Sequence, residues 1–253
     1  MYSTDLTDSQ WQVIQELLAD QRKRKHELRQ VLNAIFYLIK GGIPWRLMPN
    51  DLPPWKSVYY YYAKFRKAGI WQELTDALRE KVRQKAGRKL SPSVAILDSQ
   101  SVKTTGVGGQ RGFDAAKWVK GRKRHLVVDT LGLLLAVVVH RADIDERRGA
   151  RFVLDRLFRR KAMFPRLKVI FADGGYSGDF ETVVKKTYRW LLRIIRKPLG
   201  VKMFVLLPKR WIIERTFAWL NQHRRLSVDY ERSVKSSEAM LQVAIIRIML
   251  KKF

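Results

Sequence analysis

Two short apolar runs, far apart in the sequence, each end in a single aspartate. Residues 94–97 are followed by Asp98, and residues 169–172 are followed by Asp173. A continuous apolar run bounded by small or polar residues is typical of a strand that is buried on both faces of a sheet. Ligands of open α/β sheets bind just outside the carboxyl ends of such strands. The sequence therefore predicts that two carboxylates from distant segments meet at one edge of one sheet.

A carboxylate in that position needs a partner, because burying an unpaired charge is costly. A cation shared by Asp98 and Asp173 would remove the cost, and a divalent-metal site is the first hypothesis. The alternative is that each aspartate only caps the turn after its strand, which is common in α/β proteins. For either residue taken alone, both interpretations stay open.

The charge balance points to a polyanionic partner. The chain of 253 residues contains 51 Lys and Arg against 23 Asp and Glu, a net charge of +28. An excess of this size favours nucleic acid as the partner. The absence of cysteine excludes disulfides, thiol nucleophiles and cysteine zinc sites. No apolar run is long enough to cross a bilayer, and the N-terminus has no signal-peptide pattern, so we expect no membrane contact and a cytoplasmic location.

The first third of the chain reads as helical. Thr7 and Gln10 have the spacing of a capping box, and Gly41 and Gly42 are typical of a helix end. The pattern predicts helices over residues 8–18, 28–39, 56–67 and 71–85. A short polar stretch over residues 86–92 then marks a boundary. We expect a helical domain over residues 1–88 and a second domain over residues 89–253.

The second domain has the pattern of a mixed α/β fold. The strands are expected at residues 94–102, 125–129, 133–140, 167–173 and 190–195. The helices are expected at residues 145–163, 179–189, 209–225 and 236–251. The order predicts a mixed five-stranded sheet whose first three strands are antiparallel and whose later strands are parallel.

A third acidic residue lies on the helix after the last strand. Glu214 is one turn after Arg210, and the simplest interpretation is an i,i+4 ion pair between them. Beside two strand-end aspartates, the same glutamate completes a set of oxygen ligands suited to Mg²⁺ or Mn²⁺. Two such ions, roughly 3.5–4 Å apart, can activate the attacking oxygen and stabilise the departing oxygen of a phosphoryl transfer.

Longer segments around these residues resemble the DDE transposases of bacterial insertion sequences, in the insertion-sequence-five (IS-four/IS-five) family. The segments are ILDSQSVKTT (96–105), GRKRHLVVDTLGLLLAVVV (121–139), FADGGYSG (171–178) and LPKRWIIERTFAWLNQHRRLSVDYER (207–232). In addition, WKSVYYYYAKFRKAGIW (55–71) resembles the helical DNA-binding segment of that family. Together the segments span nearly the whole chain.

The resemblance implies a ribonuclease-H-like catalytic domain preceded by a small all-α, helix-turn-helix-like domain that binds DNA. It implies Asp98, Asp173 and Glu214 as the catalytic and metal-binding triad, with two Mg²⁺ or Mn²⁺ ions. The implied activity is metal-dependent cleavage of transposon ends followed by strand transfer into target DNA. The implied partners are double-stranded DNA, namely terminal inverted repeats and target, and further copies of the chain in a homodimer or higher oligomer. The implied location is the bacterial cytoplasm, in association with the nucleoid.

The chain departs from the pattern Tyr-x2-Arg-x3-Glu-x6-Lys that related families carry around the glutamate. Arg210 and Glu214 match, but Leu207 replaces the tyrosine and Asn221 replaces the lysine. This leaves open which side chains hold the DNA end. Basic residues near the proposed site are either a solvated face or a phosphate track. The candidates for DNA contact are Lys103, Arg122, Lys123, Arg124, Arg210, Arg215, Arg224 and Arg225.

Three other functions remain open. A structure-specific nuclease of the same fold would cut DNA without joining it. A catalytically silent, DNA-binding remnant of a transposase would bind DNA and have no activity. An RNA-binding protein would fit the charge, but the paired acids would then have no role.

Overall fold

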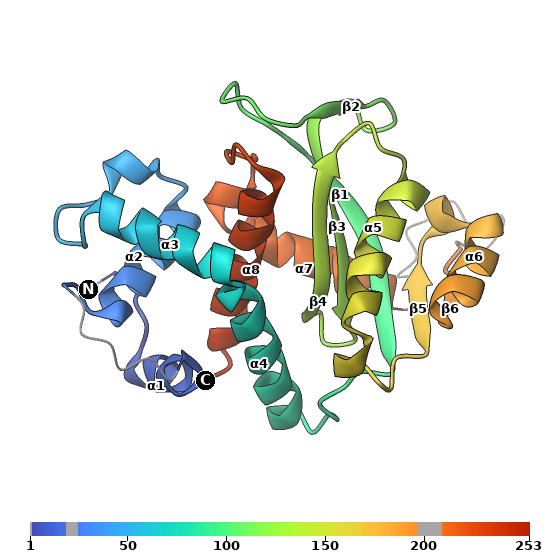
Figure 1. Cartoon of the computed structure of the whole chain (residues 1–253), viewed down its shortest axis with the longest axis horizontal. Coiled ribbons are helices and arrows are strands. Elements are labelled where there is room, and N and C mark those ends of the chain that lie inside the picture. Colours follow the sequence, from blue (N-terminus) through green and yellow to red (C-terminus); the bar gives the residue numbers. More distant parts are fainter. Residues whose placement is uncertain (1, 19–24, 197–208) are drawn as a thin grey trace.

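The computed structural model describes residues 2–18, 25–196 and 209–253 (Figure 1). Within these residues the helices are α1 (Asp8–Leu18), α2 (Leu28–Gly41), α3 (Trp55–Ala68), α4 (Ile70–Lys85), α5 (Glu146–Arg159), α6 (Asp179–Tyr188), α7 (Arg210–Asn221) and α8 (Val234–Leu250). The strands are β1 (Val94–Lys103), β2 (Gly112–Asp114), β3 (Val119–Asp129), β4 (Leu134–Arg141), β5 (Val169–Ala172) and β6 (Leu191–Ile194). The expected elements are all found, and β2 is an addition.

The strands form one mixed sheet. β1 lies in the middle, antiparallel to β3 on one side and parallel to β5 on the other. Beyond β3 lie β4 and the short β2, both antiparallel to it, and beyond β5 lies β6, parallel to it. The first part of the sheet is therefore antiparallel and the second part parallel, as predicted. The arrangement is compatible with a ribonuclease-H-like fold.

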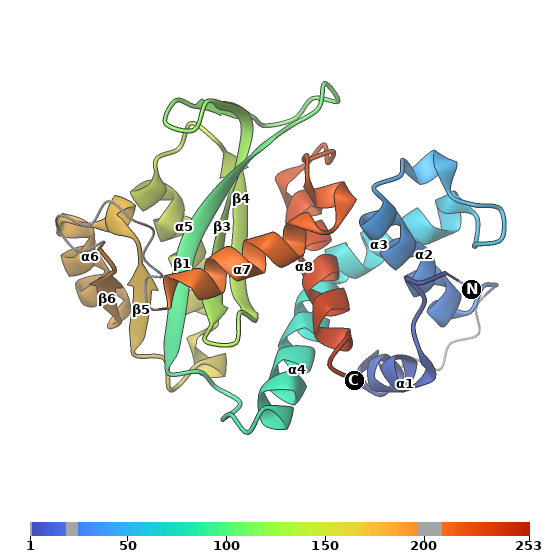
Figure 2. The same ribbon diagram turned by 180° about the vertical axis from the view of Figure 1, so that it is seen from behind.

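The two faces of the sheet are covered by different helices. Side chains alternate along β1, because successive residues of a strand point to opposite faces. Ala95 and Leu97 pack into one core with residues of α5 and α6, whereas Ile96 packs into another core with residues of α7 and α8. Figures 1 and 2 show α5 on one side of the sheet and α7 crossing β1 on the other.

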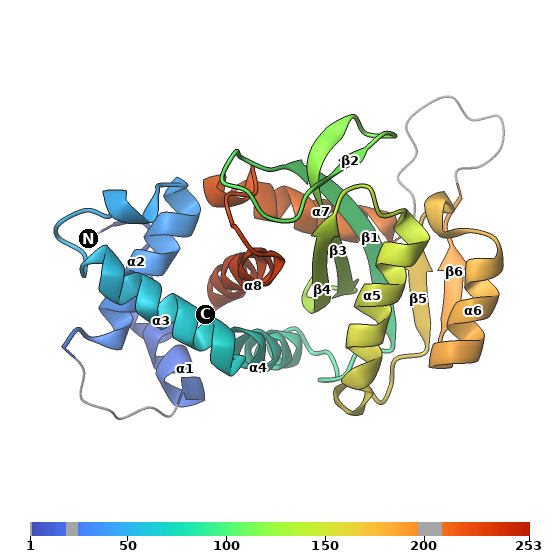
Figure 3. The same ribbon diagram turned by 45° about the horizontal axis from the view of Figure 1, so that its top comes forward.

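Helix α8 connects the sheet to the N-terminal helices. Most of its residues are buried, which explains why it has little amphipathic character. It contacts α2, α3 and α4 as well as β4, and it lies between these helices and the sheet in Figure 3. The N-terminal helices therefore share one continuous core with α7, α8 and one face of the sheet. A separate all-α domain of residues 1–88 is not confirmed by this packing.

The local signals in the N-terminal part agree with the structure. The backbone N–H of Gln10 donates to the hydroxyl of Thr7 at 3.2 Å, and the side chain of Gln10 accepts from the N–H of Thr7 at 3.3 Å, which is a capping box. Gly42 ends α2 at φ 75°, and a Cβ there would lie 2.8 Å from the Cβ of Arg224. Residues 42–54 connect α2 to α3, and Gly69 alone separates α3 from α4. Neither connection is the short turn of a helix-turn-helix unit.

Candidate active site

Asp98 lies inside β1, as the strand expected over residues 94–102 has it, and not at the strand end that the apolar run alone suggested. β1 continues to Lys103 because it pairs with β3 along its whole later half. Its parallel partner β5, however, pairs only with residues 94–96. Asp98 lies two residues beyond the last residue of this pairing, on the face of β1 that carries α7. The carboxylate therefore still sits at the edge where the parallel part of the sheet stops.

The surroundings of Asp98 favour its neutral form. Burial is the largest cause, and it raises the pKa of the carboxyl from 3.8 to about 6. The backbone N–H of Ser99, which donates to the carboxylate at 2.7 Å, opposes this shift. The negative charge of Asp173 raises the pKa further, while Arg210 and Lys117 lower it. Asp98 and Asp173 are thus electrostatically coupled, as the two apolar runs predicted.

Asp173 follows β5 directly and begins the short 3-10 helix Gly174–Tyr176. Its carboxylate accepts a hydrogen bond from the backbone N–H of Gly175 at 2.9 Å. The predicted turn-capping role is therefore present. It does not exclude metal binding, because a carboxylate oxygen that accepts this bond keeps a further lone pair and the second oxygen stays available.

Arg210 connects Asp173 to Glu214. The guanidinium lies 3.7 Å from Oδ2 of Asp173 and 3.0 Å from Oε1 of Glu214. The expected i,i+4 pair therefore forms, and the same arginine joins β5 to the first turns of α7. Within the described part of the chain, no group of three or more His, Asp or Glu side chains is arranged to hold a metal ion. In this conformation, Arg210 occupies the space between two members of the predicted triad.

The donors at this edge nevertheless suit a hard divalent cation. They are carboxylate oxygens, the ligands that Mg²⁺ and Mn²⁺ prefer. Among the described residues, Asp98 has no ion-pair partner, although a like charge lies nearby and burial penalises its ionised form. A bound cation would offset both the cost of burying the ionised carboxylate and its repulsion by Asp173. The donor chemistry of Asp98 and Asp173 therefore suits such an ion, whereas both Asp173 and Glu214 are paired with Arg210 in this conformation.

Comparison with known proteins identifies the family. The family model "Transposase DDE domain" matches residues 89–249, which is more than half of the chain. The chain belongs to the DDE transposases. A second model, "Putative transposase of IS4/5 family", matches residues 6–75. The family as a whole acts on DNA and generally uses divalent metal ions, and the resemblance noted in the sequence is confirmed.

Two relatives from Burkholderia cepacia are similar to parts of the chain. The "Putative transposase for insertion sequence element IS402" is 28% identical over 127 residues, which cover 49% of this chain and 60% of that protein. The "Insertion element IS402 uncharacterized 16.2 kDa protein" is 26% identical over 117 residues, covering 42% of this chain and 78% of that protein. This transposase thus spans less than two thirds of the first relative.

The run Arg122, Lys123 and Arg124 is buried inside the transposase. Arg122 pairs with Asp229 at 3.1 Å, and Arg124 donates to the carbonyl of Leu226 at 2.8 Å. Lys123 pairs with Glu146 at 3.0 Å and donates to the carbonyl of Ile144. Cations held internally in this way cannot reach a phosphate in this conformation. We therefore correct the predicted phosphate track, since these three side chains stabilise the fold.

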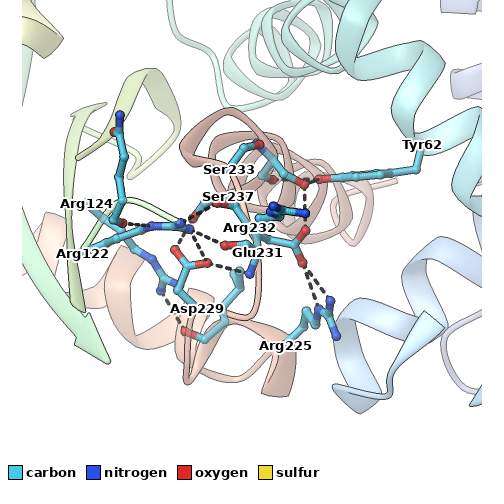
Figure 4. Close-up of polar contacts among 12 residues, drawn as sticks. Tyr62, Arg122, Arg124, Arg225, Asp229, Glu231, Arg232, Ser233 and Ser237 are labelled. Carbon is cyan, nitrogen blue, oxygen red and sulfur yellow. Dashed lines mark hydrogen bonds and ion pairs between the residues drawn. The ribbon is translucent and has the colours of Figure 1, made fainter. Parts of the chain in front are cut away.

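Arg225 belongs to the same internal network (Figure 4). Its guanidinium pairs with Glu231 at 2.8 Å and donates to the carbonyl of Ile43, so that it joins the segment after α7 to the end of α2. Glu231 also accepts from Ser236, whose hydroxyl lies 3.0 Å from that of Tyr62 on α3. Arg225 is thus a second correction, because its charge is already neutralised inside the protein.

The other predicted DNA contacts are accessible. Lys103 at the end of β1 and Arg224 after α7 are exposed. Arg210 is partly exposed beside the acids. The guanidinium of Arg215 is partly exposed and lies 4.6 Å from the ring of Trp211 and 4.5 Å from that of Trp219. Leu207 lies outside the described residues, so the departure at that position has no structural account. Asn221, the other departure, accepts from the side chain of Gln100 on β1 at 3.5 Å.

The sequence did not single out two charged residues beside the acids. Glu146 begins α5, and its side chain lies near Gly175, the residue whose N–H binds Asp173. Lys117, in the turn before β3, lies 3.6 Å from Glu146 and lowers the pKa of Asp98. Both come from segments far from the apolar runs. The sequence offered one signal for Glu146, namely its position in the first turn of the helix predicted after the hairpin.

We expect the stability of the protein to depend on pH through Asp98. Its folded-state pKa of about 6 exceeds the ordinary 3.8, so the carboxyl costs stability as pH rises from about 4 to 6 and its full cost remains above that range. Asp98→Asn removes this cost and should stabilise the metal-free protein by up to about 3 kcal/mol at pH 7–8. The gain should vanish near pH 4. Chemical denaturation in EDTA at both pH values measures it, and an equal gain at both would contradict the pKa shift.

Proposed function

We propose that this transposase cleaves phosphodiester bonds at the ends of an insertion element and transfers the freed 3′ ends to target DNA. Asp98, Asp173 and Glu214 are the residues that carry the chemistry. The observation that supports this most directly is the coupling of Asp98 to Asp173 on neighbouring parallel strands, with the helix of Glu214 joined to Asp173 through Arg210. A turn role alone would not require Asp98 and Asp173 to lie near each other, and Glu214 would join them by exchanging its pairing with Arg210.

The three carboxylates would hold one or two Mg²⁺ or Mn²⁺ ions, which supply activation of the attacking oxygen and stabilisation of the departing oxygen. Asp98 fixes one side of the site because strand pairing holds its backbone rigid. Asp173 fixes the other side through its hydrogen bond to Gly175. No covalent bond between protein and DNA is needed in this proposal, because the ions would activate the attacking oxygen directly.

Arg210 has two roles in this proposal. Without a cation, it neutralises Asp173 and Glu214 and keeps the two carboxylates from repelling each other. With Asp173 and Glu214 engaged as metal ligands, the guanidinium of Arg210 would be free beside the site and could bind a DNA phosphate in bidentate fashion. Lys103 and Arg224, both exposed, are proposed to position the DNA backbone without reading its sequence.

The substrate in this proposal is double-stranded DNA, with the N-terminal helices contributing to its recognition. The net charge of +28 supports a polyanionic partner. The end-binding and target-binding steps are proposed to involve two or more copies of the chain, because the two ends of an element must be brought together. No helix in the described part of the chain is long and apolar enough to cross a membrane.

A strand-transfer assay tests the proposal against the nuclease alternative. The purified transposase is mixed with Mg²⁺, an oligonucleotide that carries a pre-cut 3′ end of its element, and a supercoiled target plasmid. We expect covalent joining of the labelled end to the plasmid. A nuclease of the same fold would nick the plasmid and leave the label unjoined. Binding in a gel shift with neither cleavage nor joining would instead support the silent DNA-binding remnant.

A further inference from the structure

Two adjoining hollows lie beyond the catalytic side of α7. The larger, of about 360 Å³, is formed by the C-terminal ends of α4 and α8, the β3–β4 turn and α7. The smaller, of about 210 Å³, lies between α7, α8 and Lys40 of α2. Trp219, Ile248 and Lys252 line both, so the two hollows adjoin, and we call them together the α4–α8 groove.

The lining of the α4–α8 groove is basic and contains no acidic residue among the described residues. The apolar part of the wall comes from Trp219 and neighbouring aliphatic side chains. The cations of the lining are Lys40, Lys85, Arg215, Arg247, Lys251 and Lys252. A phosphate flanked by apolar sugar atoms would complement such a wall.

Several of these cations are held in place by backbone carbonyls. Lys40 donates to the carbonyl of Gln222 at 2.8 Å, and Arg215 donates to that of Leu131 at 3.0 Å. Arg247 donates to the carbonyl of Thr4 at 2.6 Å. Within the described ranges none of the groove cations forms an ion pair with a carboxylate. The nearest acidic influences are those of Asp5 on Arg247 and Asp129 on Arg215, both without direct contact.

This differs from the buried cations elsewhere in the fold. Arg122 and Arg225 each have a carboxylate partner, so their charges are neutralised internally. In the α4–α8 groove, backbone carbonyls hold Lys40, Arg215 and Arg247 in place, and no carboxylate among the described residues contacts them directly. A fixed, uncompensated set of cations is preorganised for an anion, because little side-chain entropy remains to be lost when the anion binds.

The like charges in the groove repel one another. Burial lowers the pKa of Lys40, and the charges of Lys251, Arg247 and Arg224 lower it further. His223, also in the lining, has its pKa lowered to about 4, chiefly by burial and also by Lys40 and Arg247. An anion in the groove would relieve this repulsion. The electrostatics therefore support the same occupant as the geometry.

We infer that the α4–α8 groove binds the sugar–phosphate backbone of the DNA that leaves the active site. The inference rests on the proposed function, because Glu214 and Arg215 are consecutive on α7 and face the catalytic edge and the groove respectively. Figure 2 shows α7 running from β1 and β5 toward α8 and α4. The groove thus extends the DNA path from the cleaved bond toward the N-terminal helices, and it adds phosphate contacts that the active site alone does not provide.

Site-specific crosslinking tests this inference directly. The chain has no cysteine, so Lys252→Cys provides a single thiol that can carry an aryl-azide crosslinker at the groove. Lys186→Cys on the exposed face of α6 is the matched control. With a 40-bp duplex in EDTA, we expect the label at position 252 to crosslink to DNA at least tenfold more than the label at position 186. Equal crosslinking would overturn the inference.

Equilibrium binding provides the second measurement. Lys251→Glu combined with Lys252→Glu should weaken binding of the 40-bp duplex at least tenfold and lower the slope of log K against log salt by about 1 for each lost phosphate contact. Lys185→Glu combined with Lys186→Glu changes the net charge equally and should have little effect. An equal loss of DNA affinity in both double variants would mean that net charge alone acts. A loss of affinity for an RNA duplex without a loss for the DNA duplex would assign the groove to RNA. Either result overturns the inference.

These experiments are independent of catalysis. Because they are run in EDTA, a transposase without strand-transfer activity can still show groove-specific binding. Conversely, if the Lys251→Glu, Lys252→Glu double variant bound DNA and carried out strand transfer as well as the original protein, the result would support the proposed function and contradict the groove inference. The exposed positions of Lys251 and Lys252 at the end of α8 leave the core intact, and thermal melting of each variant confirms its fold.

Discussion

Replacing Asp98 by asparagine is expected to lower DNA cleavage by on the order of a thousandfold or more, which corresponds to about 4 kcal/mol of activation free energy. The amide keeps the size of the side chain but loses the negative charge and one of the two acceptor oxygens. The site would then offer one fewer anionic ligand for a cation beside Asp173. The Asp98→Asn variant should bind DNA with the affinity of the original protein, because no DNA contact is assigned to this carboxylate.

The measurement is Mg²⁺-dependent cleavage of labelled DNA that carries the ends of the element. Asp8→Asn, at an exposed aspartate of α1, is the matched control and should retain full activity. Loss of a fold cannot explain the expected result, since Asp98→Asn is predicted to stabilise the metal-free protein at neutral pH. An Asp98→Asn protein with normal cleavage would remove this residue from the proposed triad.

Asp229→Ala is expected to destabilise the transposase by about 3–5 kcal/mol, because it leaves Arg122 as an uncompensated buried charge. The carboxylate of Asp229 accepts from Arg122 at 3.1 Å, from the hydroxyl of Ser237 and from the backbone N–H of Glu231 at 3.0 Å (Figure 4). All these partners are buried or nearly so. For a chain of this length, the expected fall in Tm is roughly 6–20 °C.

Thermal and urea unfolding of the purified variant measure this effect. Asp143→Ala is the matched control, because Asp143 is exposed and pairs only with Arg141 across two residues on the surface. Its effect should be below about 0.5 kcal/mol. A comparable loss in both variants, or a loss below 1 kcal/mol for Asp229→Ala, would show that the network around Asp229 does not hold the segment after α7 against the sheet.

Much of the fold could be predicted because its signals are local. The apolar runs, the hairpin around Gly132 and the capping box of Thr7 and Gln10 each report the conformation of a few neighbouring residues. The family motifs in turn indicated which three acids belong together. The apolar run before Asp98 taken alone would end the strand too early, because it does not show where β3 stops pairing with β1.

The basic run over residues 122–124 shows a property that local sequence signals did not predict. Arg122, Lys123 and Arg124 form a continuous basic run that is typical of a phosphate track, yet their side chains are buried. The partners of Arg122 and Arg124, which are Asp229 and the carbonyl of Leu226, lie about a hundred residues later in the chain. Conversely, the cations of the α4–α8 groove lie on helices from both ends of the sequence, so no single segment of the sequence predicts the groove.

The sequence by itself indicated the helices, five of the six strands and their antiparallel or parallel directions, and it singled out three candidate acids, because periodicity and motif spacing are properties of short segments. Only the tertiary structure decided which of the described cations are neutralised by a carboxylate inside the protein and which are exposed or without such a partner. It also decided that α8 joins the N-terminal helices to the sheet in one core. The physical reason is that burial of a charge depends on the partners that folding brings to it, and those partners come from distant parts of the chain.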